Sequence, residues 1–321
     1  GVISGIPSQS VISQSVTIKV SNEVSDRSFS LSFTVLTPIS SFSYPQSSYV
    51  LSKNHPFSVS PSVNGDGLSF SIISGSLPIG LSLNPSNGVI SGIPSQSTSS
   101  QSLTIKAFNE VSNQSFSLSF TVLQSITSFS YSQSSYVLSS NDSFSITPTV
   151  NGDDLLFSIT SGSLPIGLLL NSTTGVISGI PSQSVSSQSV TIKASNELSD
   201  RSFSISFTVL TPISSFSYPQ TSYILALGED YSASPETQGT NPFFSISSGS
   251  LPIGLSLNPT TGLISGIPSQ SVSSLLITIK ASNEVNYQSF SIIFTIITPI
   301  SSFSYPQTSY VLSIDDSFSI T

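Results

Sequence analysis

The chain has no cysteine, methionine or tryptophan, and one histidine among its 321 residues. The absence of cysteine excludes a disulfide framework and metal sites built from thiolates. Charged residues make up 7% of the chain, against about 25% in an average protein. The net charge of −8 argues against a nucleic-acid partner, because phosphate binding needs clustered basic residues.

Long hydrophobic runs are also missing. No run approaches the length of about 18 apolar residues that a membrane-spanning helix needs, so we expect no membrane span in this segment. No secretory leader is recognisable, but the chain begins in the middle of a repeat, so this carries no information. Hydrophobic residues still make up 37% of the chain, and disorder normally combines low hydrophobicity with high charge. The sequence therefore predicts folded domains with apolar cores.

The chain repeats itself with a strict period of 87 residues. The phenylalanine of Ser-Phe-Ser-Tyr recurs at that interval, at Phe42, Phe129, Phe216 and Phe303. A strict long period is typical of a tandem array, and 87 residues suit a small domain better than one rung of a solenoid. We expect each repeat to have its own core.

The period predicts three complete repeats between two partial ones. The predicted units are the C-terminal part of a repeat at 1–40, complete repeats at 41–127, 128–214 and 215–301, and the N-terminal part of a repeat at 302–321. The counterparts of residues 61–87 are missing at both ends, so we expect a window of a longer array. Completion of the ends by the same chain or by another is left open. Strand donation is less favoured, because both ends lack the same middle strands.

Apolar residues alternate with serine or threonine within each repeat, most clearly at residues 115–122. A period of two indicates a half-buried strand, here with Phe116, Leu118 and Phe120 facing a core. The strands predicted in one repeat are 49–51, 57–59, 68–72, 81–83, 89–91, 103–107 and 115–122. Asn87-Gly88 predicts a hairpin between two of them. About seven short strands with regular turns indicate an all-β sandwich.

Two motifs then point to a family. LPIGLSLN at residues 77–84 precedes GVISGIP at 88–94, and related versions lie at 164–181 and 251–268. Asn109, Asn196 and Asn283 follow the later strand. The pattern resembles the putative-Ig (He_PIG) repeat, also called the dystroglycan-type cadherin-like domain. The resemblance implies a tandem array of Ig-like (cadherin-like) β-sandwiches, a fold common in large extracellular surface, adhesion and appendage proteins.

The sequence offers few residues that could bind a metal ion or catalyse a reaction. Cadherin-like domains suggest calcium, which needs six to eight oxygen ligands. Asp142, Glu229 and Asp316 share one register, but its fourth member is His55 and no set of carboxylates recurs with it. We expect solvated loop acids, no metal and no cofactor. The serines lack an activating histidine or lysine at a recognisable spacing, so we expect no enzyme activity.

Some charges do recur in register. A lysine and a glutamate four residues apart occur in every repeat, at Lys19, Lys106, Lys193, Lys280, Glu23, Glu110, Glu197 and Glu284. They are interpreted either as a ligand-binding stripe or, as we prefer, as charges that flank a turn and deter pairing at a strand edge.

Two kinds of modification site are candidates. Asn113, Asn141 and Asn171 begin N-glycosylation sequons in predicted turns, although a serine-rich chain also generates sequons by chance. The outward strand faces carry hydroxyls where charges are usual, at Ser30, Ser32, Thr34, Ser117, Ser119, Thr121, Ser204, Ser206 and Thr208. O-linked glycans would solvate these faces, or the faces would pack against neighbouring subunits. Codon bias toward serine is the plain alternative.

These observations favour a structural role. We expect a repeat segment of a long extracellular protein that forms a stalk or a (glyco)fibril, with copies of itself and covalent glycans as partners, because identical surfaces at equal intervals can assemble helically. The alternative is a cell-surface adhesin that binds glycan or protein, since the loops at 226–231 and 238–242 depart from those of the other repeats. A spacer attached to a hydrolase is a third hypothesis.

Overall fold

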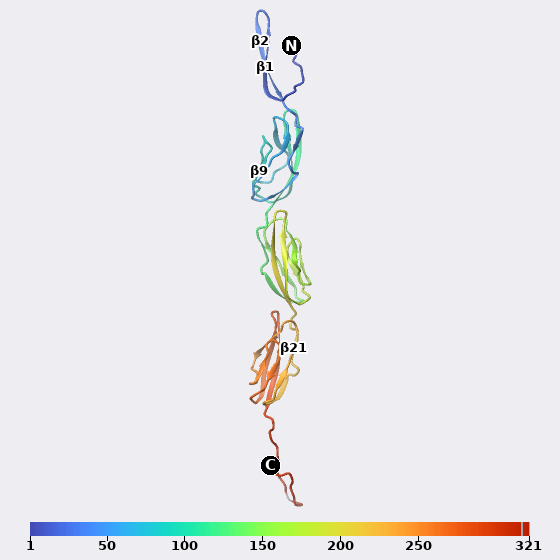
Figure 1. Cartoon of the computed structure of the whole chain (residues 1–321), viewed down its shortest axis with the longest axis vertical. Helices are drawn as coiled ribbons and strands as arrows, with labels where there is room; N and C mark the ends of the chain where they lie inside the picture. The colour runs from blue at the N-terminus through green and yellow to red at the C-terminus, as the bar shows by residue number, and fades with distance from the viewer. Residues whose placement is uncertain (316, 321) are drawn as a thin grey trace.

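The computed structural model describes residues 1–315 and 317–320. Every regular element in this part of the chain is a β-strand, 29 in all. They form three sandwiches that follow one another in a row, with a hairpin before them and an extended segment after them (Figure 1). The prediction of an all-β tandem array is confirmed.

The two ends of the chain differ from the sandwiches. Strands β1 (Val11–Ser21) and β2 (Asp26–Val35) pair antiparallel, and most of their side chains are exposed. Residues 302–315 and 317–320 contain no strand.

The first sandwich contains nine strands: β3 (Ser41–Ser43), β4 (Ser48–Ser52), β5 (Phe57–Val59), β6 (Ser62–Asn64), β7 (Ser69–Gly75), β8 (Leu81–Leu83), β9 (Ile90–Gly92), β10 (Thr98–Phe108) and β11 (Asn113–Leu123). Four of them form the sheet β4-β11-β10-β7, three form the sheet β5-β9-β8, and β3 pairs with β6. Strand β4 runs parallel to β11, whereas the other neighbours are antiparallel. The long β10–β11 hairpin is therefore the centre of the larger sheet.

The other two sandwiches repeat this topology. The second consists of β12 (Phe129–Ser130), β13 (Ser135–Ser139), β14 (Phe144–Ile146), β15 (Thr149–Val150), β16 (Leu156–Gly162), β17 (Leu168–Leu170), β18 (Ile177–Gly179), β19 (Val185–Ser195) and β20 (Asp200–Leu210). The third consists of β21 (Ser215–Ser217), β22 (Ser222–Ala226), β23 (Tyr231–Ala233), β24 (Glu236–Gln238), β25 (Phe243–Ser248), β26 (Leu255–Leu257), β27 (Ile264–Gly266), β28 (Val272–Ser282) and β29 (Tyr287–Ile297). Their four-stranded sheets are β13-β20-β19-β16 and β22-β29-β28-β25.

All seven strands predicted for the first complete repeat are present, with ends shifted by up to five residues. The sequence did not reveal β3 and β6, which have three residues each. So few residues show no alternation that distinguishes a strand from a loop.

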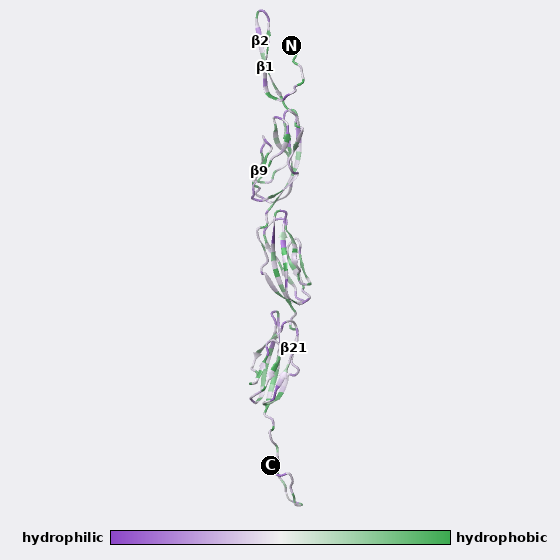
Figure 2. Cartoon of the chain, in the orientation of Figure 1, coloured by the Kyte–Doolittle hydropathy of each residue, from purple (hydrophilic) through white to green (hydrophobic). Residues whose placement is uncertain are grey.

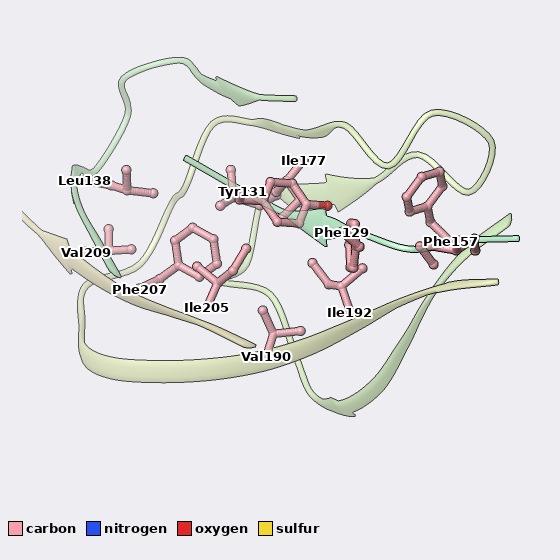
Figure 3. Close-up of a cluster of buried hydrophobic side chains, with 13 residues drawn as sticks. Phe129, Tyr131, Leu138, Phe157, Ile177, Val190, Ile192, Ile205, Phe207 and Val209 are labelled. Carbon is pink, nitrogen blue, oxygen red and sulfur yellow. The ribbon is translucent and has the colours of Figure 1, made fainter. Parts of the chain in front are cut away.

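Each core lies between the two sheets. Hydrophobic and polar residues alternate along the strands (Figure 2), as a half-buried sheet requires. In the second sandwich Val190, Ile192, Ile205 and Phe207 of the larger sheet are almost fully buried. They pack with Leu138 and Phe157 of the same sheet, and with Phe129, Tyr131 and Ile177 from outside that sheet (Figure 3).

A buried tyrosine fixes the predicted hairpin loop in each sandwich. The Tyr44 hydroxyl donates to the carbonyl of Gly88 at 2.5 Å, and Tyr131 and Tyr218 make the equivalent bonds to Gly175 and Gly262. Burial raises the pKa of Tyr44, so the hydroxyl stays a neutral donor. Gly88 has a φ of +71°, which glycine adopts without strain. The hairpin prediction at Asn87-Gly88 is thus confirmed.

Replacing Thr237 with valine should stabilise the third sandwich. The Thr237 hydroxyl is buried without a hydrogen-bond partner among the described residues, and the other two sandwiches have Val63 and Val150 at this position. Removing an unpaired buried hydroxyl should raise the free energy of unfolding by about 1–2 kcal/mol. Denaturant unfolding measures this change. The matched control, Val150→Thr, should destabilise the second sandwich by a similar amount, and equal stability of all variants would contradict the argument.

Candidate functional site

The linkers that enter the sandwiches are held by hydrogen bonds. At the first junction the backbone N–H of Ile39 donates to Ser112 Oγ at 2.6 Å. The N–H and hydroxyl of Thr37 donate to Asp66 Oδ2 at 3.2 and 2.5 Å. Asn109 Nδ2 donates to the carbonyls of Thr37 and Asp66 at 3.1 and 2.8 Å. The linker is therefore fixed on the sandwich that it enters.

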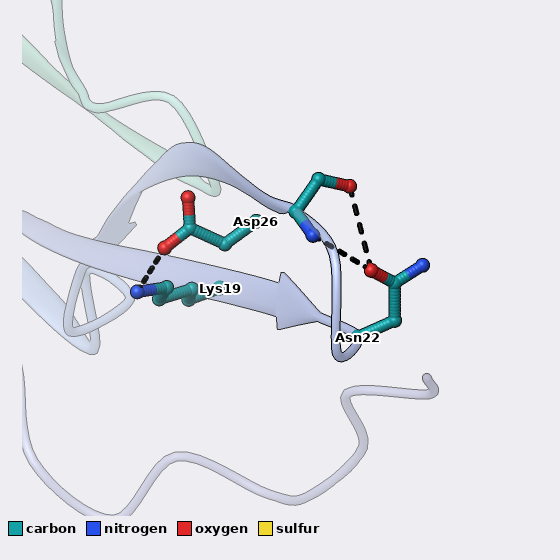
Figure 4. Close-up of polar contacts among 4 residues, drawn as sticks. Lys19, Asn22 and Asp26 are labelled. Carbon is teal, nitrogen blue, oxygen red and sulfur yellow. Dashed lines mark hydrogen bonds and ion pairs between the residues drawn. The ribbon is translucent and has the colours of Figure 1, made fainter.

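We call the hydrogen bonds of Ser112, Asp66 and Asn109 with the linker the clamp. Its asparagine, Asn109, also shapes the turn of the long β10–β11 hairpin. Asn109 Oδ1 accepts bonds from the backbone N–H groups of Val111 and Ser112, so both ends of one amide are used. In the N-terminal hairpin Asn22 makes the same turn bonds, including one from the N–H of Ser25 (Figure 4). The sequence showed this asparagine as a family motif, but it did not show that the side chain holds the linker.

The second junction repeats the clamp. Asn196 Nδ2 donates to the carbonyls of Gln124 and Asp153 at 3.0 and 2.9 Å. The N–H of Ile126 donates to Ser199 Oγ at 2.7 Å, and the N–H of Gln124 donates to Asp153 Oδ2 at 2.7 Å. An aspartate side chain thus accepts a hydrogen bond from a linker N–H at each of the first two junctions.

At the third junction the linker is also held by hydrogen bonds, but no acidic side chain of the described residues takes part. Asn283 Nδ2 donates to the carbonyls of Thr211 and Thr240 at 3.0 Å each. The N–H of Thr211 donates to Thr240 Oγ1 at 2.8 Å, and the N–H of Ile213 donates to Asn286 Oδ1 at 2.6 Å. The backbone geometry is kept while the side chains change.

Apolar side chains add to the junctions. Ile126 and its counterparts Ile39 and Ile213 belong to the core clusters of the sandwiches that follow them. Leu123 at the end of β11 is 3% exposed, whereas Ile297, at the same place in β29, is 52% exposed and is not followed by a sandwich. The next sandwich therefore covers Leu123. Ser97 Oγ also donates across this junction to Asp153 Oδ2 at 2.5 Å.

We expect acid to loosen the first junction and to leave the third junction, whose linker bonds to Thr240 instead of an acidic side chain, unchanged. Hydrogen bonds from the Thr37 side chain, the Ser10 side chain and the Thr37 backbone lower the pKa of Asp66. A carboxyl whose pKa is lowered by folding stabilises the fold above its unfolded pKa, and this contribution disappears as the pH falls through the folded pKa, below about pH 4. An NMR titration should therefore move the amide resonance of Thr37 in this range. The amide of Thr211, which is bonded to Thr240, should not follow, and a shared titration would contradict the assignment.

Three of the four recurrent lysines lie on central strands. Lys106 on β10 pairs with Ser115 on one side and Ser71 on the other, and Lys193 and Lys280 are placed in the same way, so the interpretation as edge protection is wrong for the sandwiches. Lys19 lies on β1, which pairs with β2 alone. Lys19 forms an ion pair with Asp26 instead of Glu23 (Figure 4). Both side chains of this pair are more than half exposed, so it contributes little to stability.

The candidate hydroxyls lie on the outer face of the larger sheet and on the matching strand β2. Ser117 shares a hydrogen bond with Thr104 on the neighbouring strand at 3.0 Å, and Ser204 shares one with Thr191 at 2.9 Å. The exposed members are Ser30, Ser32, Thr34, Ser117 and Ser204, and the half-buried members are Ser119, Thr121, Ser206 and Thr208. Glycans at these positions stay a prediction.

The three sequon asparagines are exposed. Asn113 begins β11, and Asn141 lies in the turn between β13 and β14 with a φ of +68°. Asn171 Oδ1 accepts hydrogen bonds from the N–H and the hydroxyl of Thr173 at 3.0 and 2.9 Å. Their use as acceptors stays a prediction.

Among the described residues, no group of three or more histidine, aspartate and glutamate side chains is placed to hold a metal ion. Asp316, one of the acids weighed for calcium, lies outside the described residues. None of the described segments forms a helix of the length and hydropathy that crossing a bilayer requires.

Sequence comparison identifies the repeated unit. The profile of the Putative Ig domain family (He_PIG) matches residues 32–125, 122–212 and 206–299. The chain belongs to the Putative Ig domain family. The three matches follow the three sandwiches, so the prediction of Ig-like domains is confirmed. The dystroglycan-type, cadherin-like part of the resemblance has no such support and stays a prediction.

Solved structures of Ig-domain arrays have a similar fold. The I67–I69 fragment of titin is 14% identical, with a TM-score of 0.47, over 81% of this chain and 99% of that fragment. Drosophila OTK domains 3–5 are 10% identical, with a TM-score of 0.41, over 79% and 96% of the two chains. The N-terminal eight domains of Down Syndrome Cell Adhesion Molecule are 14% identical, with a TM-score of 0.43, over 90% and 40%. No curated protein sequence matches the chain.

Proposed function

We propose that this chain is a segment of a stiff stalk or filament outside the cell, built from Ig-like domains and acting without catalysis or a cofactor. The observation that carries the proposal is the clamp on the linker, which is repeated at three junctions. Domains joined by free linkers move relative to one another, whereas a linker with bonded backbone groups transmits orientation from one domain to the next. Such an array keeps its length under load.

Copies of the chain are the proposed partners. The domains offer equivalent surfaces at a constant interval, and such surfaces support lateral or end-to-end association into a fibril. Covalent glycans are the second proposed component. The exposed hydroxyls of Ser30, Ser117 and Ser204 and the exposed sequons support it, because sugars would solvate faces that carry few charges.

A cell-surface adhesin is the second candidate. The observation in its favour is a hollow beside the third junction, lined among others by Leu210, Asn241, Phe243 and Glu284. Asn241 belongs to a loop that departs from the other repeats, and Phe243 is 56% exposed. An aromatic ring beside an amide and an acid can contact a sugar ring. The ligand class of this candidate is a glycan or a protein.

Electron microscopy of the native material tests the proposal. Straight filaments with regular subunits, and extra density on serine, threonine or sequon asparagine side chains, are the expected result. Separate, flexible strings of domains with bare side chains would contradict both the stiff junctions and the fibril. In that case the adhesin would be the better account, and glycan-array binding would be the next measurement.

A further inference from the structure

The outer face of the larger sheet is more apolar in the third sandwich than in the first two. Leu276 on β28 and Ile293 on β29 stand where the first two sandwiches have serines, at Ser102, Ser189, Ser119 and Ser206. Leu276 is 58% exposed and Ile293 is 38% exposed. These apolar side chains are not needed for folding, because the same sheet forms with serine at both positions in the other sandwiches.

The two side chains belong to a continuous stripe. Leu276 pairs directly with Ile293 across the β28–β29 ladder, so the two side chains are neighbours on one face. Strand β22 lies on the other side of β29 and pairs Ile224 with Thr295. Thr295 is two residues from Ile293, so Ile224 lies on the same face, diagonal to Ile293. Ile224 is 74% exposed, and the stripe Ile224–Ile293–Leu276 crosses three adjacent strands.

Small hydroxyl side chains surround the stripe. Thr278 and Ser291 form a cross-strand pair beside it, with their oxygens 2.9 Å apart. Lys280 also lies on this face, next to Thr278 in the alternation, and its ammonium lies over the ring of Tyr287 at 5.4 Å. The stripe is therefore an apolar centre whose rim carries hydroxyls and one lysine. Exposed apolar stripes of this kind mark contact surfaces.

We infer that the stripe packs against the same stripe of a second copy of the chain, face to face. A symmetric contact places identical surfaces opposite each other, and here it brings no charges together at the centre. Strands of this length, four abreast, give a face of roughly 500 Å². Two such faces bury about 1,000 Å², the lower end of the range for specific association. The inference rests on the proposed self-association and names one surface that carries it.

Sedimentation velocity of the whole chain tests the inference. Wild-type protein should shift from monomer toward dimer as its concentration rises through the micromolar range, as a small interface predicts. The double variant Leu276→Ser with Ile293→Ser, which restores the residues of the other two sandwiches, should bind itself at least about tenfold more weakly. The ends of the chain are the same in both proteins, so a difference reports on the stripe alone.

Two control variants make the result specific. Ser102→Leu with Ser119→Ile adds the missing side chains to the first sandwich and should strengthen association. Ile253→Ser with Ile267→Ser removes two exposed isoleucines that lie outside the four-stranded sheet and should leave association unchanged. Thermal unfolding of each variant checks that the fold is kept.

The outcomes separate the inference from the proposed function. Equal association of wild type and the Leu276→Ser, Ile293→Ser variant would overturn the stripe as the contact. Filaments that form from this variant as readily as from wild type would overturn it too, while self-association as the function would stand. A wild-type chain that stays monomeric at every concentration, in material that also forms no filaments, would overturn both.

Discussion

Gly80→Ala should unfold the first sandwich at a much lower temperature than wild type. Gly80 has a φ of +100°, and a Cβ added there would lie 1.9 Å from the carbonyl oxygen of Ile93. The oxygen belongs to the backbone, so no rotamer change relieves the clash. Backbone strain and the clash together should cost about 3–5 kcal/mol, which lowers the melting temperature of a domain of this size by about 12 °C or more. Calorimetry measures the shift, and hydrogen exchange assigns it to one sandwich.

Gly228→Ala is the matched control for this prediction. Gly228 has a φ of +84°, but an added Cβ would meet nothing within 4 Å. This variant should show the cost of the backbone conformation alone, about 1 kcal/mol. If the two variants lose the same stability, the clash with Ile93 contributes nothing and the close approach of the two segments is wrong.

Asn196→Ala should both destabilise the second sandwich and bend the array. The variant loses two bonds to linker and loop carbonyls and two bonds that form the hairpin turn. At about 1 kcal/mol for each hydrogen bond, the free energy of unfolding should fall by about 2–4 kcal/mol. The carbonyl of Gln124 also loses its contact with the sandwich. Small-angle scattering should therefore show a shorter average end-to-end dimension.

Asn171→Ala separates stability from stiffness. Asn171 Oδ1 accepts three hydrogen bonds in a turn of the same sandwich, but none of them involves a linker. We expect this variant to lose stability while its scattering profile keeps the wild-type dimension. A scattering profile of Asn196→Ala that also matches wild type would show that the clamp does not set the angle between domains.

The repeat, the all-β fold class and the inward-facing residues could be predicted from the sequence. The 87-residue period is a property of the chain, and alternation at residues 115–122 reports directly which side chains face a core, because successive residues in a strand point to opposite faces. Leu118 and Phe120 are buried as predicted, at 2% and 0% exposure. The Asn87-Gly88 hairpin was predictable for the same reason, since its geometry depends on local backbone preferences.

Contacts between residues far apart in the sequence could not be predicted in this way. Ile39 and Ser112 are separated by 73 positions, and the sequence pattern does not say that a linker N–H reaches that hydroxyl. The parallel pairing of β4 with β11 likewise depends on how the sheets close around the core. Ile224, Leu276 and Ile293 become a surface only when three strands are adjacent in one sheet. The alternation of apolar and polar residues shows which face of the sheet a side chain lies on. The order and register of the strands depend on the packing of the whole domain.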